Sequence, residues 1–256
     1  MIIRLHFPVC PVEGYIFLSH QTPSIRTTLK SLYRVGGAAA LIAAMFALTQ
    51  IIIEIIGVGF MHIEVPTTII GWFLLLQSQT LLGLTELTMF QIPAFIFCVP
   101  AFLALYVALK RSNGAYVMVA TALAFLGIAV YISSNTVFSM LSLSGQYAAA
   151  TTDEQRSMLL AAGQAMLAIY QGISVNVGLF LFMVAILMVS GIMLRSNIFD
   201  SATAYVGILA GVVALAYYIS SAFTQMAIFI LEAAGIFFVV WVILVGRRLI
   251  QLGYSK

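Results

Sequence analysis

The sequence predicts an all-α integral membrane protein: six transmembrane helices, two external surface helices, and both termini in the cytoplasm. Hydrophobic residues make up 63% of the 256 residues and charged residues only 7%, whereas about 25% of the residues in a soluble domain are charged. A soluble core could not bury so much apolar surface. Six apolar runs have the length of a membrane helix, and lysines and arginines gather at their ends.

The chain is predicted to form a single six-helix transmembrane domain over residues 31–256, preceded by a cytosolic N-terminal tail over residues 1–30. Prolines and polar residues interrupt this tail, so it lacks the continuous apolar core of a signal peptide. The first long apolar run begins after Arg34. We expect that run to act as an uncleaved targeting segment.

The predicted spans need about 20 apolar residues each. In chain order they are residues 35–56, 84–109, 116–138, 173–194, 203–219 and 223–245. A competing count splits the almost continuously apolar stretch 68–109 into two helices, which gives seven spans. Six spans are favoured because the basic residues then obey the positive-inside rule.

With six spans and the N-terminus inside, ten of the eleven basic residues are cytoplasmic and only Arg156 is outside. The ten are Arg4, Arg26, Lys30, Arg34, Lys110, Arg111, Arg195, Arg247, Arg248 and Lys256. Seven spans would move six of the eleven to the outside and remove the bias. The pattern therefore predicts a multi-pass protein of the cytoplasmic (plasma) membrane, with both termini inside.

Two long external segments remain. Residues 66–83 contain Trp72 among leucines and glutamines, a mixture typical of a helix at the membrane surface. In residues 141–172, Thr152 and Gln155 have capping-box spacing, which predicts a helix start. A straight helix from there to residue 194 would be roughly 60 Å long. We therefore expect a bend near Gln171 and Gly172, and two external helices that roof the bundle.

Three carboxylates lie within or beside the apolar runs and form the best candidate site, because ionisable groups are costly in hydrocarbon. We predict a polar funnel in the outer half of the bundle, with Glu232 near the membrane midplane at its floor and Glu54 and Glu86 nearer the rim. Seven residues are candidates for ligand or proton binding: Glu232, Glu86, Glu54, Gln50, Gln225, Asn135 and Asn176. Gln50 and Glu54 share a helix face, as do Gln225 and Glu232.

Three classes of function stay open. The first is binding or transport of a small solute, lipid or proton through this outward-facing cavity. The second is a non-catalytic structural or accessory membrane protein, in which Glu232 only donates a hydrogen bond between helices, worth about 0.6 kcal/mol on average. The third is an intramembrane enzyme that uses paired carboxylates.

Cofactors and most partners are not indicated. No histidine or lysine is placed inside a span, which argues against bis-histidine haem and a retinal Schiff base. His62 and Glu64 match no metal motif, so we predict no metal catalysis and no cofactor. The basic residues form no nucleic-acid patch, which leaves membrane lipids as partners. Gly207 and Gly211 form a Gly-x-x-x-Gly, which serves either the bundle itself or a homo-oligomer.

Several stretches together resemble a known family. They are LYRVGG at 32–37, LALYVAL at 103–109, FSMLSLSG at 138–145, QYAAATTD at 146–153, LLAAG at 159–163, MLR at 193–195 and ATAYVGIL at 202–209. They resemble the uncharacterised membrane family called domain of unknown function 4386, over roughly residues 31–245. The resemblance implies a multi-helix membrane protein and brings no activity or catalytic residues with it.

Overall fold

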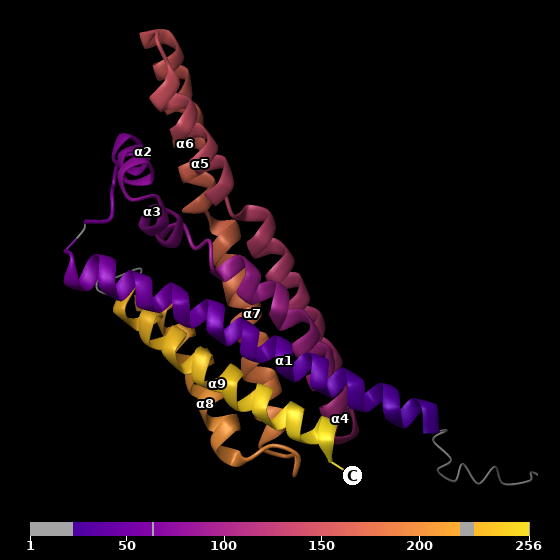
Figure 1. Ribbon diagram of the computed structural model, residues 1–256. Helices are drawn as coiled ribbons and strands as arrows, with labels where there is room; N and C mark the ends of the chain where they lie inside the picture. Colours follow the sequence, from indigo (N-terminus) through magenta and orange to yellow (C-terminus); the bar gives the residue numbers. More distant parts are fainter. Residues whose placement is uncertain (1–22, 63, 221–227, 256) are drawn as a thin grey trace, which may run out of the picture.

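The computed structural model describes residues 23–62, 64–220 and 228–255. Within these ranges the regular elements are helices, and no strand occurs. In chain order they are α1 (Pro23–Glu54), the π-helix η1 (Ile55–Phe60), α2 (Ile69–Ser78), α3 (Thr80–Glu86), α4 (Gln91–Ser134), α5 (Val137–Ala149), α6 (Asp153–Tyr170), α7 (Ile173–Met193), α8 (Ser201–Ser220) and α9 (Ile228–Tyr254) (Figure 1). Helix α1 therefore begins within the segment predicted to be a tail.

Helix α4 consists of two arms that fold back on each other at Asn113, whose backbone is not helical (φ −159°, ψ 82°). The rings of Phe95 and Tyr131, one on each arm, lie 4.8 Å apart between centroids. The basic pair Lys110 and Arg111 lies beside the fold. The arms correspond to the predicted second and third spans, except that residues 84–90 belong to α3 and a short turn and that α4 ends at Ser134 instead of residue 138.

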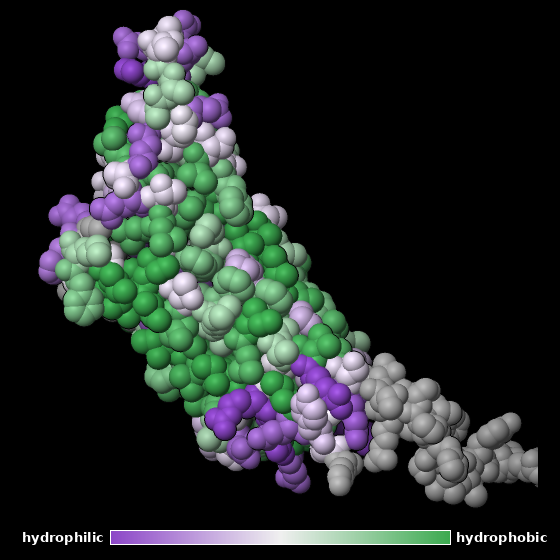
Figure 2. Space-filling view, viewed as in Figure 1, coloured by the Kyte–Doolittle hydropathy of each residue, from purple (hydrophilic) through white to green (hydrophobic). Residues whose placement is uncertain are grey.

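Five helical stretches of the described chain are long and apolar enough to cross a membrane. They are Leu29–Gly57, Gln91–Ala149, Asp153–Met193, Ser201–Tyr218 and Ile230–Tyr254. Figure 2 shows apolar side chains over the middle of the visible face and hydrophilic ones at both ends. A membrane-embedded helical bundle, the coarser part of the fold prediction, is thereby supported.

The bundle is held by close contacts between small residues. An added Cβ at Gly178 on α7 would lie 2.8 Å from the Tyr131 backbone nitrogen and 2.9 Å from the Gly127 carbonyl oxygen. Helix α8 uses Gly207 against Ser190 and Trp241, and Gly211 against Leu187. The Gly-x-x-x-Gly motif thus packs α8 onto its own neighbours α7 and α9.

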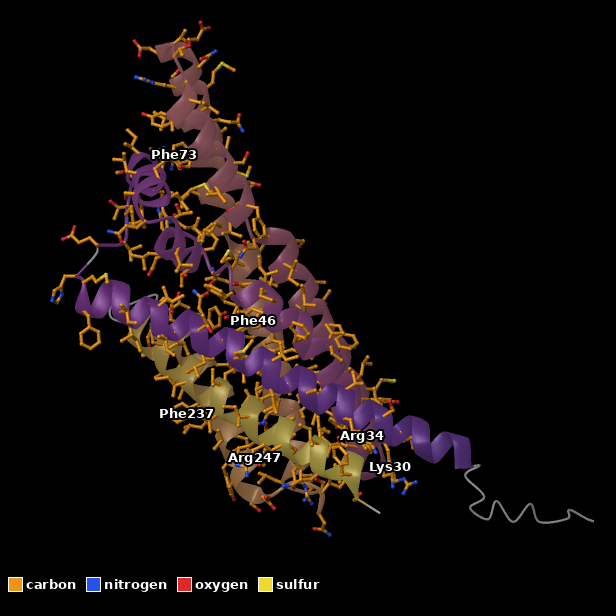
Figure 3. The ribbon with its side chains drawn as sticks, in the orientation of Figure 1. Lys30, Arg34, Phe46, Phe73, Phe237 and Arg247 are labelled. Carbon is orange, nitrogen blue, oxygen red and sulfur yellow. The ribbon has the colours of Figure 1, made fainter. Side chains whose placement is uncertain are left out.

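Helices α5 and α6 form a hairpin that projects beyond the other helices, rather than a roof across the bundle (Figure 1). Helix α6 starts as expected, because the Thr152 hydroxyl accepts a hydrogen bond from the Gln155 backbone nitrogen (3.2 Å). The expected break at Gln171 and Gly172 separates α6 from α7. Helix α2 packs on this hairpin, where Phe73 lies in a second apolar cluster (Figure 3).

Basic residues lie at the end of the bundle opposite this hairpin: Lys30, Arg34 and Arg247 (Figure 3). The Arg34 Nε donates to the Gly253 carbonyl oxygen (3.0 Å), and its guanidinium lies 4.4 Å from the centre of the Tyr254 ring. The Arg248 Nε donates to the Ile198 carbonyl oxygen (2.6 Å). These contacts join α1, α9 and the α7–α8 loop.

The close approach of α4 and α7 predicts that two glycines of α7 respond differently to substitution by alanine. Gly178→Ala should destabilise the protein by about 1–3 kcal/mol, because backbone atoms rather than flexible side chains obstruct the new methyl group. Gly191→Ala on the same helix should be neutral or stabilising by up to about 1 kcal/mol, since nothing lies within 4 Å of its Cβ position. Thermal unfolding in detergent measures both. Equal melting temperatures for the two variants would contradict the packing.

Candidate functional site

The candidate site lies at the end of α1 remote from the arginines, where Gln50 and Glu54 share one helix face. Gln50 is only 4% exposed. Its Nε2 donates to Glu54 Oε1 and to the backbone carbonyl oxygen of Thr85. Because both partners are acceptors, the amide nitrogen must face them. The Gln50 Oε1 therefore points the other way, and it has no hydrogen-bond partner among the described residues.

Glu86 is the last residue of α3, outside the five membrane-crossing candidates. Its backbone carbonyl oxygen accepts a hydrogen bond from the Tyr170 hydroxyl (3.0 Å). Its side-chain Oε1 is buried and has no partner in the described part of the chain. Burial, and to a smaller extent the negative charge of Glu232, raises the pKa of Glu86 to about 7.

Glu232, on α9, lies level with Glu54 rather than deeper in the bundle. Helices α1 and α9 are antiparallel, and a Cβ at Gly235 would lie 3.6 Å from Ile51 Cδ1. The charge of Glu232 acts on both Glu54 and Glu86. Helix α9 continues to Tyr254 instead of ending at residue 245 as predicted, and the depth of Glu232 in the membrane stays a prediction. The three carboxylates therefore form one cluster.

Among the described residues, the charges that act on Glu54 and Glu86 come from other glutamates, with no cation among them. Within the described ranges, no three His, Cys, Asp or Glu residues lie close enough together to hold a metal ion. His62 and Glu64 are exposed. The cluster is thus an acidic site spread over three helices rather than a compact chelate.

The turn at Thr88, beside the cluster, is hydrogen-bonded by Asn135, one of the predicted residues. Thr88 has a left-handed backbone (φ 61°), uncommon for a β-branched residue. Its hydroxyl oxygen accepts hydrogen bonds from the Tyr131 hydroxyl (2.7 Å) and from Asn135 Nδ2 (3.1 Å). The Asn135 Oδ1 accepts from the Val137 backbone nitrogen (3.0 Å). Asn135 therefore stabilises the turn after Glu86.

Of the other two predicted residues, Asn176 and Gln225, the structure describes only Asn176, which makes its contacts elsewhere. Asn176 Nδ2 donates to the Gly172 carbonyl oxygen (3.2 Å), one turn earlier on its own helix. The Asn176 backbone oxygen accepts from the Tyr218 hydroxyl (3.0 Å), which joins α7 to α8. Gln225 lies outside the described residues.

Sequence reasoning missed the tyrosines around the cluster. The Tyr170 phenol lies within electrostatic reach of Glu54, Glu86 and Tyr217. The rings of Tyr217 and Tyr218 are 5.2 Å apart between centroids, in an edge-to-face arrangement. Their signal in the sequence is the Tyr217-Tyr218 pair at the end of a predicted span, on the side away from the basic residues.

A separate open groove runs between α5 and α6. Its volume is about 570 Å³, and it is lined by Phe138, Ser139, Ser142, Leu143, Gln146, Ala162, Ala165 and Met166. None of the three glutamates lines it. The predicted outward-facing cavity at the glutamates stays a prediction.

Comparison with known proteins adds one finding. The family model described as Domain of unknown function (DUF4386) matches residues 75–253. The chain belongs to this family. The DUF4386 match includes Glu86 and Glu232, but it begins within α2 and so leaves out Gln50 and Glu54 of α1. No curated protein and no solved structure matches the chain.

The turn beside the cluster predicts a stability effect in this DUF4386 protein. Thr88→Val keeps the side-chain shape but removes the acceptor for Tyr131 and Asn135, and the Tyr131 side chain is only 2% exposed. Stranding a buried donor costs about 1–3 kcal/mol, so the melting temperature should fall by several degrees.

Thr121→Val is the matched control. Thr121 is buried, and its hydroxyl donates only to the Val117 carbonyl oxygen of its own helix. The Thr121→Val melting temperature should therefore stay near that of the wild type. Equal decreases in melting temperature for the two variants would show that the Thr88 hydroxyl contributes no more stability than the Thr121 hydroxyl does.

Proposed function

We propose that this DUF4386 protein is a six-span protein of the cytoplasmic membrane that binds a proton or a small cationic solute at the Glu54–Glu86–Glu232 cluster. The observation that carries the proposal is the convergence of three carboxylates from α1, α3 and α9, where the described part of the chain places no cation among the charges that act on Glu54 and Glu86.

The chemistry of such a cluster favours positive charge. Each ionised carboxylate disfavours ionisation of its neighbours, and burial disfavours every charge. A bound proton or cation relieves both penalties, and the effect grows as the local dielectric constant falls. A cluster of this kind is therefore a receptor for a proton or a cation, which also fits coupling to transport.

The proposed topology counts the two arms of α4 separately. Together with α1, α7, α8 and α9 they make six passes, and an even number returns both termini to one side. The end that carries Lys30, Arg34 and Arg247 would face the cytoplasm, following the positive-inside rule (Figure 3). The glutamate cluster and the α5–α6 hairpin would then lie towards the outside.

Protonation of Glu86 predicts how stability depends on pH. An acid whose pKa is higher in the folded protein than its ordinary value of 4.5 binds its proton more tightly when folded. Its contribution to stability is complete below pH 4.5 and is lost as the pH rises through about 7. The melting temperature should therefore fall between pH 5 and pH 8, an interval of roughly one unit either side of this titration.

Glu86→Gln should make the melting temperature depend less on pH between pH 5 and pH 8, because glutamine cannot ionise. Glu54 on α1 and Glu232 on α9 are further carboxylates that act on this position, so part of the slope remains, whereas the neighbouring Tyr170 phenol does not ionise in this interval. Glu64→Gln, which changes an exposed acid, is the matched control and should keep the wild-type slope. An unchanged slope in Glu86→Gln would refute a proton site at Glu86.

The proposed orientation predicts which positions react with a membrane-impermeant maleimide in intact cells. Cys98 is buried and can be kept, while Cys10 is replaced by serine. In that background, Thr151→Cys at the tip of the α5–α6 hairpin should be labelled, because its position is exposed. Ser255→Cys should be labelled only after the cells are lysed. The reverse pattern would invert the topology.

A further inference from the structure

Two buried side-chain oxygens at the glutamate cluster have no hydrogen-bond partner in the described ranges: Gln50 Oε1 and Glu86 Oε1. An amide oxygen and a carboxylate oxygen both accept hydrogen bonds. Buried polar atoms are almost always paired, since an unmade hydrogen bond in the interior costs free energy. A group that completes this site must therefore supply donors.

The orientation of Gln50 makes this requirement specific. Its Nε2 is held by two acceptors on two different elements, Glu54 Oε1 and the Thr85 backbone oxygen. Turning the amide over would bring Oε1 against the Thr85 carbonyl, which can only accept. Gln50 is also 96% buried, being 4% exposed, so bulk water does not satisfy the oxygen.

Aromatic rings lie beside the same carboxylates. Tyr170 lies within electrostatic reach of Glu54 and Glu86, and Tyr217 is the next aromatic side chain that acts on it. Tyr218 stacks edge-to-face on Tyr217 and also meets Phe180, with 5.9 Å between ring centroids. The faces of such rings attract cations. A cation with an apolar body would contact both the carboxylates and these rings.

A bare metal ion suits this arrangement poorly. The described carboxylates are too far apart for three of them to ligate one ion. A metal ion also brings no N–H or O–H group of its own to Gln50 Oε1. An organic ammonium ion brings charge, donors and size together.

We propose that the cluster binds a protonated primary or secondary amine that carries an apolar group. This inference rests on the proposed function, because it names the class of cation that the same glutamates take. The ammonium N–H groups donate to Gln50 Oε1 and to the Glu86 carboxylate, and the apolar group lies against Tyr217.

The test measures the binding of four probes to the purified full-length protein in detergent at pH 8 by isothermal titration calorimetry. Benzylammonium has a positive charge and N–H donors. Benzyltrimethylammonium has the charge without an N–H group, and benzyl alcohol has an O–H donor without the charge. Butylammonium replaces the aromatic body by an aliphatic one. Benzylammonium should bind at least about tenfold more tightly than benzyltrimethylammonium, given that hydrogen bonds to charged groups are the stronger ones.

Two pairs of variants locate the site. Gln50→Met removes the Oε1 acceptor, and with it the Nε2 donor, at nearly constant volume, so it should weaken benzylammonium about tenfold more than it weakens benzyltrimethylammonium. Gln77→Met is the matched control, because Gln77 also donates to a backbone oxygen, that of Ser144, but away from the glutamates.

Tyr217→Leu should weaken the binding of both aromatic cations, whereas Tyr205→Leu at an exposed position of the same helix should not. Melting curves without ligand identify any variant that fails to fold, and Tyr217→Leu then carries the test independently of Gln50→Met.

The outcomes separate this inference from the proposed function. Equal affinities for benzylammonium and benzyltrimethylammonium would overturn the donor requirement while leaving a cation site. Binding of neither benzylammonium nor butylammonium, with the pH effect of Glu86→Gln intact, would overturn amine binding and leave a proton site. Loss of the pH effect as well would overturn the proposed function. Binding of benzylammonium that Gln50→Met weakens and Gln77→Met does not would support the inference.

Discussion

The antiparallel packing of α1 against α9 is the constraint on which the rest of the structure depends. Glycines make it close: an added Cβ at Gly37 would lie 2.8 Å from the Gly246 carbonyl oxygen. At one end of the pair, Arg34 is held by the last turn of α9. At the other end the same register brings Glu232 level with Glu54. The shared alignment of two helices thus produces both a basic end and an acidic cluster.

Bringing the three carboxylates together costs free energy, which the contacts around the cluster offset. Three carboxylates repel one another in a partly buried place, and the Gln50 amide hydrogen-bonds α1 to the Thr85 carbonyl oxygen of α3. The turn after α3 is strained at Thr88 and is held by Tyr131 and Asn135. These features suit a site that gains stability when positive charge enters. Repulsion among the glutamates and the unpaired oxygens point to the same kind of ligand.

Apolar run length and charge position predicted the helices well, because a membrane helix must satisfy its own backbone hydrogen bonds over a fixed thickness. The capping pair Thr152 and Gln155 likewise located the start of α6. Helix ends were less predictable, since α9 runs past Arg247 and Arg248 as a helix whose end is bound by α1. The fold of α4 at Asn113 falls in the gap predicted between the second and third spans, residues 110–115. Asn135 and Asn176 were chosen for their polarity, yet their amides serve local turns and helix contacts.

The sequence by itself determined that this is a helical membrane protein of the DUF4386 family and that Glu54, Glu86 and Glu232 are its unusual charges. Hydrophobicity, length and basic residues are local properties, so they can be read along the chain. Only the tertiary structure decided that the three glutamates meet, that Gln50 leaves an acceptor unpaired and that tyrosines surround them. Those facts depend on the register between helices, which is set by side-chain packing between residues far apart in the chain.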